Sequence, residues 1–197
     1  MRFLVYVLVA LGAGILAGHF YAPEFGNLYE VILYLLVLII GIDLGQSFRL
    51  GEIRKLGRLA IKLPLGTLLG SLLGGLAASL LLGIELRWGL AVAAGCGWYS
   101  LAGPLIAQYS AVYGTLGFLA NLTREIFTVL LYPVAIGKMR KELAVSMGGA
   151  TTMDTTLPIM TKFGGSEVAL IAFVHGFVLT ALVPFVVPSI LQLLAGG

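Results

Sequence analysis

Charged residues are scarce in this chain of 197 residues, and their scarcity excludes most soluble folds. Asp, Glu, Lys and Arg make up 11% of the sequence, whereas soluble globular domains carry about 25%. Hydrophobic residues make up 59%, and the mean hydropathy is +1.05. We therefore expect an all-α, polytopic transmembrane helical bundle, a multi-pass protein of the cytoplasmic membrane with the lipid bilayer as its main surrounding.

Cysteine and histidine are also rare, which argues against an internal disulfide, a metal site and nucleophilic catalysis. Cys96 has no second cysteine for an internal disulfide, and the two histidines build neither a metal-ligand pattern nor a nucleophile with its base. We therefore expect no enzyme, no cofactor and no metal. The net charge of +3 indicates membrane topology and no nucleic-acid partner, because Lys and Arg concentrate in the cytoplasmic loops of membrane proteins.

Long apolar stretches predict the membrane spans. A spanning helix needs about 20 mostly apolar residues. Eight of the twelve basic residues fall within 49–62 and 138–141, so both loops should be cytoplasmic, with the N-terminus inside and the C-terminus outside. The five predicted spans cover residues 3–21, 28–44, 59–82, 119–136 and 168–193.

Two further apolar segments, 88–111 and 143–165, are interrupted by glycine, proline and hydroxyl residues. The loop orientations allow one crossing between 82 and 138, so we expect each segment to be a re-entrant hairpin, the first from outside and the second from the cytoplasm. The chain would then consist of a three-helix scaffold, 1–83, and a transport core, 84–197.

Two hairpin-plus-span units, 88–137 and 142–194, make up the predicted core. Sliding one unit along the other aligns Gly95 with Gly149 and Asn121 with His175. The match is at the level of hydropathy, with few identities, and it predicts an inverted-topology repeat.

The two broken segments are the predicted substrate site, because irregular backbone at membrane depth is tolerated only where it is buried in protein or lines a wet cavity. Glycines there would allow close backbone approach, while aromatic, hydroxyl and acidic groups would bind substrate or protons. The alternative is that the small residues only permit helix packing and the threonines bond their own helices. The candidates are Gly97, Trp98, Tyr99, Ser100 and Gly103 in the first segment, and Gly149, Thr151, Thr152, Asp154 and Thr155 in the second.

Charged residues inside spans are costly and therefore informative. Glu125 is the leading candidate, followed by Asp154 and then Asp43. A desolvated carboxyl group can exchange a proton for a cationic substrate, which is a direct mechanism for antiport. For Arg124 we expect snorkelling to the outer interface or pairing with a distant carboxylate. His175 is either a hydrogen-bonded packing residue or a proton relay.

Four motifs resemble the lysine exporter family of the LysO type: GWYSLAG at 97–103, NLTRE at 121–125, GATTMDTTLP at 149–158 and VHGF at 174–177. The resemblance implies export of L-lysine, and of its analogue thialysine, coupled to the entry of protons. Members of that family carry further spans ahead of this region. The resemblance therefore also implies a small membrane subunit that supplies such spans, or a homo-oligomer. The alternatives are a sodium-coupled carrier of an organic anion and a non-transporting membrane scaffold subunit.

Overall fold

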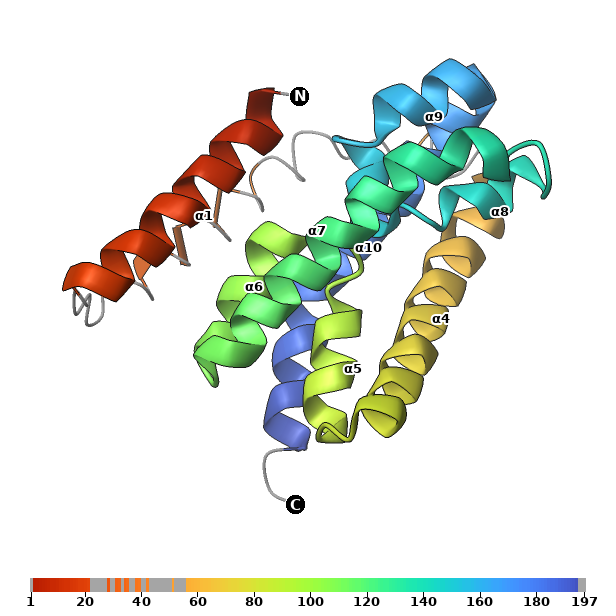
Figure 1. Ribbon diagram of the computed structural model, residues 1–197. Helices are drawn as coiled ribbons and strands as arrows, with labels where there is room; N and C mark the ends of the chain where they lie inside the picture. Colours follow the sequence, from red (N-terminus) through yellow and green to blue (C-terminus); the bar gives the residue numbers. More distant parts are fainter. Residues whose placement is uncertain are drawn as a thin grey trace. The chain divides into compact units, whose positions relative to one another are not determined.

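The computed structural model describes residues 2–21, scattered positions between 28 and 51, and residues 56–194. Every element in these residues is helical, and no strand occurs among them. The chain divides into two compact units, residues 1–39 and 40–197. The first unit contains helix α1, Arg2–Tyr21, which confirms the helix predicted for 3–21 (Figure 1). Most of the predicted span 28–44, including Asp43, lies outside the described residues.

Three long helices form the frame of the second unit: α4, Leu59–Leu82, α7, Ala111–Ala135, and α10, Ser166–Leu193 (Figure 1). The helix predicted for 59–82 is confirmed, and Gly83 ends it in the left-handed conformation, at φ 65°. In the described part of the chain, α4 and α10 are the helices long and apolar enough to cross a membrane.

The helix predicted for 119–136 begins earlier than expected, at Ala111. The apolar segment before it ends at Ala107, and the extended backbone of Ser110 separates the two helices. Residues 111–118, which lie between the predicted limits of the broken segment and of the span, are therefore the first turns of α7.

Both broken segments are interrupted helices. The first consists of α5, Leu86–Ala94, and α6, Tyr99–Ala107, and in the break between them Cys96 and Gly97 have φ of 47° and 94°. The second consists of α8, Lys141–Val145, the 3₁₀ helix η1, Gly149–Met153, and α9, Leu157–Gly164.

The two breaks touch each other in the middle of the second unit. The amide of Ala150 donates a hydrogen bond of 2.8 Å to the carbonyl oxygen of Cys96. A Cβ atom on Gly97 would lie 2.9 Å from the carbonyl oxygen of Gly148, and one on Gly149 would collide with the Cys96 carbonyl. In Figure 1, α8 and α9 extend from this contact toward one end of the unit, and α5 and α6 extend toward the other.

The long helices hold the breaks by close packing. Gly103 lies against α7, where its Cβ would be 2.9 Å from that of Phe118, so this glycine serves helix packing. At the other end, a buried cluster joins α4, α7, α8, α9 and α10. It contains Leu63, Tyr132, Ala144, Val145, Met160, Val168, Ile171 and Ala172.

Candidate substrate site

Asn121 on α7 fixes the first break. Its Oδ1 accepts a hydrogen bond of 2.7 Å from the amide of Gly97, and its Nδ2 donates to the carbonyl oxygens of Val92 and Gly117, at 2.9 and 2.8 Å. The side chain is 4% exposed. One side-chain amide therefore bonds three backbone groups, among them the Gly97 amide of the break, which lies beyond the end of α5.

We expect Asn121→Ala to lower the free energy of unfolding by about 1–3 kcal/mol, because it leaves the buried amide of Gly97 in the break without its partner. Chemical unfolding of the protein in detergent measures the change. Thr115→Ala on the same helix is the matched control, since it removes only an exposed hydroxyl bond to Ala111. Equal effects of the two substitutions would show that Asn121 does not hold the break.

His175 on α10 holds the second break in a corresponding way. Its Nδ1 lies 3.0 Å from the hydroxyl of Thr152 in η1, and its Nε2 lies 2.8 Å from the hydroxyl of Thr67 in α4. Thr152 also donates to the carbonyl oxygen of Ala172, at 2.7 Å. The imidazole is 1% exposed, and partners on both nitrogens favour the packing interpretation of this residue.

Thr151 also uses its hydroxyl inside the second break. It donates to the carbonyl oxygen of Gly148, at 2.9 Å, and lies 3.2 Å from the hydroxyl of Thr156. Thr151 and Thr152 thus hold the 3₁₀ turn in shape with their hydroxyl groups.

Glu125 lies with three other candidates. Its carboxyl group interacts electrostatically with Tyr99, Asp154 and Thr155. Glu125 is 8% exposed, and its Oε2 has no hydrogen-bond partner among the described residues. Tyr99 is buried, whereas Asp154 and Thr155 are exposed in the turn after η1, where the Thr155 amide donates to Asp154.

This acid cluster, Tyr99, Glu125, Asp154 and Thr155, combines groups from the start of α6, from α7 and from the second broken segment. Two carboxylates and two hydroxyls are the kinds of group that bind a cation or a proton. Trp98 and Ser100 are half-buried on either side of Tyr99.

Arg124 differs from the sequence expectation, because its guanidinium turns inward. Nε and Nη2 donate to the carbonyl oxygens of Met147 and Ser146, both at 2.9 Å, and Nη1 donates to the hydroxyl of Ser71 at 2.8 Å. The carbonyls after α8 carry partial negative charge, which suits a cation. Neither Ser71 nor these carbonyls was a sequence candidate, since a serine in a Leu- and Gly-rich helix resembles a packing residue.

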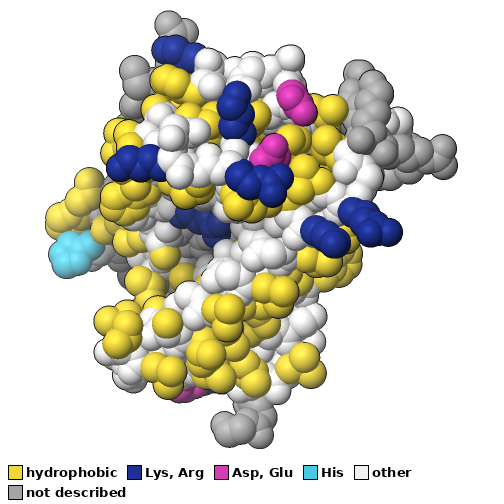
Figure 2. Space-filling model, turned by 90° about the vertical axis from the view of Figure 1, so that its right-hand side faces the viewer, with side chains coloured by type: hydrophobic (Ala, Val, Ile, Leu, Met, Phe, Trp, Pro, Cys, Tyr) yellow, Lys and Arg dark blue, Asp and Glu magenta, His cyan; other side chains and the backbone are white. Residues whose placement is uncertain are grey.

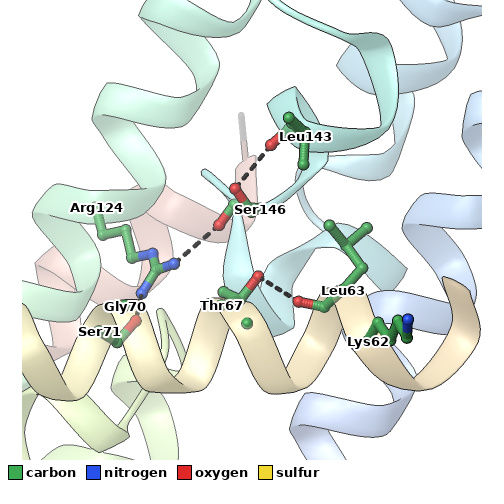
Figure 3. Close-up of a pocket in the computed structure, with 9 residues that line it drawn as sticks. Lys62, Leu63, Thr67, Gly70, Ser71, Arg124, Leu143 and Ser146 are labelled. Atoms are coloured by element: carbon green, nitrogen blue, oxygen red, sulfur yellow. Dashed lines mark hydrogen bonds between the residues drawn. The ribbon is translucent and has the colours of Figure 1, made fainter.

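Arg124 also borders a cavity of about 630 Å³, shown in Figure 3. The cavity lies between α4, α7 and α8, and α4 contributes most of its wall. A second cavity, of about 300 Å³, follows along α4 and shares Ser71 and Arg124 with the first. The first is lined by Lys62, Leu63, Gly66, Thr67, Gly70, Ser71, Arg124, Leu143 and Ser146.

Basic side chains gather at one end of the second unit, where α4 begins and α8 and α9 lie (Figures 1 and 2). The lower part of the same face in Figure 2 is mostly hydrophobic or uncharged. No group of three His, Cys, Asp or Glu residues suited to a metal occurs in the described part of the chain. The basic residues at this end are Arg58, Lys62, Lys138, Arg140, Lys141 and Lys162.

Comparison with known proteins identifies the family. The family model described as lysine exporter LysO matches residues 8–191. The chain is 34% identical over 159 residues to "Lysine exporter LysO" of Escherichia coli (strain K12), covering 80% of this chain and 53% of that protein. It therefore spans about half the length of that relative.

A second relative is closer to this chain in length. It is "Putative lysine exporter" of Haemophilus influenzae, 34% identical over 168 residues, a match covering 82% of this chain and 82% of that protein. The search of solved structures found no match. With the family model covering most of its length, the chain belongs to the lysine exporter LysO family.

Proposed function

We propose that this protein exports L-lysine across the cytoplasmic membrane by exchange with protons, and that it also accepts thialysine. The names of the two relatives support the substrate. The observation that carries the proposal is the acid cluster, in which the buried Glu125 interacts with the exposed Asp154 of the second broken segment. A lysine ammonium group needs negative charge of this kind, and the burial of Glu125 strengthens the attraction.

The cluster supplies a simple exchange. With lysine bound, its ammonium charge offsets the carboxylates of Glu125 and Asp154. After the ammonium leaves, the two negative charges repel each other, which favours uptake of a proton. A proton and a lysine ammonium therefore compete for one site, and this competition couples their opposite movements.

We propose that the protein has the membrane topology predicted from its sequence. Five spans would cross the bilayer, and the two broken segments would be re-entrant hairpins of an inverted repeat, with units 88–137 and 142–194 and a scaffold at 1–83. The contact between Ala150 and Cys96 would then lie near the bilayer centre. The basic end of the second unit would face the cytoplasm, as positive charge in such proteins does.

The family resemblance predicts that the chain works with a small membrane subunit or with a second copy of itself. The mass of the detergent-solubilised complex tests it. Co-purification of a small apolar chain favours the subunit, whereas a multiple of the 20.8 kDa chain favours the oligomer.

Counterflow in proteoliposomes tests the proposed function. Vesicles loaded with unlabelled L-lysine should accumulate radiolabelled L-lysine, and external thialysine should compete.

A sodium-coupled carrier of an organic anion is the second candidate function, favoured by Arg124 in the large cavity. Accumulation of labelled citrate or malate under a sodium gradient, without lysine counterflow, would select that candidate. Folded protein that moves neither solute would be a scaffold subunit.

A further inference from the structure

The large cavity beside Arg124 is separate from the acid cluster. It opens between α4, α7 and α8, and none of the four cluster residues lines it. Two glycines leave open space at its α4 wall, because a Cβ atom added to Gly66 or Gly70 would meet nothing within 4 Å. At about 630 Å³, it falls within the range of roughly 300–1,000 Å³ that is usual for small-molecule pockets.

The charged residues lining this cavity are both cations, Lys62 and Arg124. A guanidinium has five N–H donors, and three of them are used by Ser71, Ser146 and Met147. The side chain of Cys96 also interacts with this guanidinium. In the described part of the chain no carboxylate forms an ion pair with Arg124, because the pairs there join Arg87 to Glu85 and Arg140 to Glu142. The cavity thus presents positive charge and a guanidinium whose N–H donors are not all used.

Ser71 on the α4 wall fixes the Arg124 guanidinium at the edge of this cavity. Ser71 holds one Nη of Arg124 in place, and Figure 3 shows the guanidinium between α4 and the chain at Ser146. The Ser146 hydroxyl donates to Leu143, while its carbonyl accepts from Arg124. The remaining donors of a fixed guanidinium suit a planar carboxylate.

We infer that this cavity binds the α-carboxylate of the exported amino acid, with Arg124 as its charge partner and Ser71 as the residue that orients the guanidinium. The inference rests on the proposed function and adds a second recognition site to it. Glu125 and Arg124 are neighbours, so their side chains leave α7 about 100° apart and serve different sites. The carboxylate site makes the transporter selective for amino acids over diamines.

Binding to the purified full chain in detergent tests this site, with L-lysine, cadaverine and L-norleucine as probes. Cadaverine has no carboxylate, and norleucine has no side-chain ammonium. We expect cadaverine to displace labelled lysine roughly 100-fold more weakly than lysine itself, as is usual when a desolvated charged contact is lost. Ser71→Ala should reduce that ratio to about tenfold, because the guanidinium loses its fixed orientation.

A cavity-filling substitution tests the same site without touching Arg124, whose loss would also release the second break. Gly70→Leu should abolish norleucine binding and weaken lysine binding by about 100-fold, while leaving the melting temperature unchanged. Ala77→Leu, an exposed position of α4 outside both cavities, is the matched control and should bind normally. Cadaverine binding as tightly as lysine to the wild type, or Gly70→Leu binding norleucine normally, would overturn the carboxylate site.

The outcomes separate this inference from the proposed function. If lysine is transported but norleucine does not bind and cadaverine equals lysine, the proposed function stands and the carboxylate site is wrong. If lysine is not transported while norleucine binds the wild type and not Gly70→Leu, the carboxylate site stands and lysine export is wrong.

Discussion

Glu125→Gln is expected to reduce lysine counterflow by at least about 100-fold, a loss of roughly 3 kcal/mol in a desolvated charged contact. Gln has almost the same shape as Glu but carries no charge, so it can neither offset an ammonium nor take up a proton. Glu125 is buried, and its Oε2 has no hydrogen-bond partner in the described part of the chain. The melting temperature should therefore stay the same or rise, because a buried charge is removed.

The matched control is Glu167→Gln, which neutralises an exposed carboxylate in the first turn of α10. It should transport lysine at the wild-type rate. A Glu125→Gln protein that melts at a much lower temperature would assign Glu125 a structural role. Undiminished counterflow would remove Glu125 from the transport site altogether.

Gly149→Ala is expected to destabilise the protein by more than about 3 kcal/mol, because two costs combine. Gly149 has φ of 63°, which costs other residues roughly 1 kcal/mol, and its Cβ would collide with the carbonyl oxygen of Cys96. The collision would also push the Ala150 amide away from that carbonyl and separate the two breaks. Unfolding in detergent measures the loss.

Gly83→Ala is a closely matched control for this substitution. Gly83 has φ of 65°, and its added Cβ would meet nothing within 4 Å, so it bears the conformational cost alone. We expect about 1 kcal/mol of destabilisation there. Similar losses at both glycines would show that the breaks are not in tight contact.

The sequence predicts the helical frame well, because its signals are local. The apolar run 59–82 and Gly83 after it define α4, and glycines mark the interruptions of both broken segments, at Gly97 in the first and Gly149 in the second. Pro104 lies inside α6 and interrupts nothing. The start of α7 at Ala111 was missed, since its first turns are as apolar and glycine-rich as the preceding segment. Such errors arise where neighbouring segments share a composition.

The site was predictable only in part, because contacts between distant segments leave little local trace. Acidic residues are rare in this apolar chain, which is why the sequence predicts Glu125 and Asp154 as site residues. The partners of Arg124 were not, since they are a serine of α4 and two backbone carbonyls. Gly97 and Gly149, the glycines predicted to allow close backbone approach, each lie against the backbone of the opposite broken segment.

Lysine-driven proton movement tests the central claim most directly. Proteoliposomes containing the wild-type chain and a pH-sensitive dye would receive external L-lysine with no initial pH gradient. Because lysine and protons move in opposite directions, lysine entry should make the vesicle interior more alkaline, and Glu125→Gln should abolish the signal. Lysine entry without any change in internal pH would contradict exchange with protons at the acid cluster.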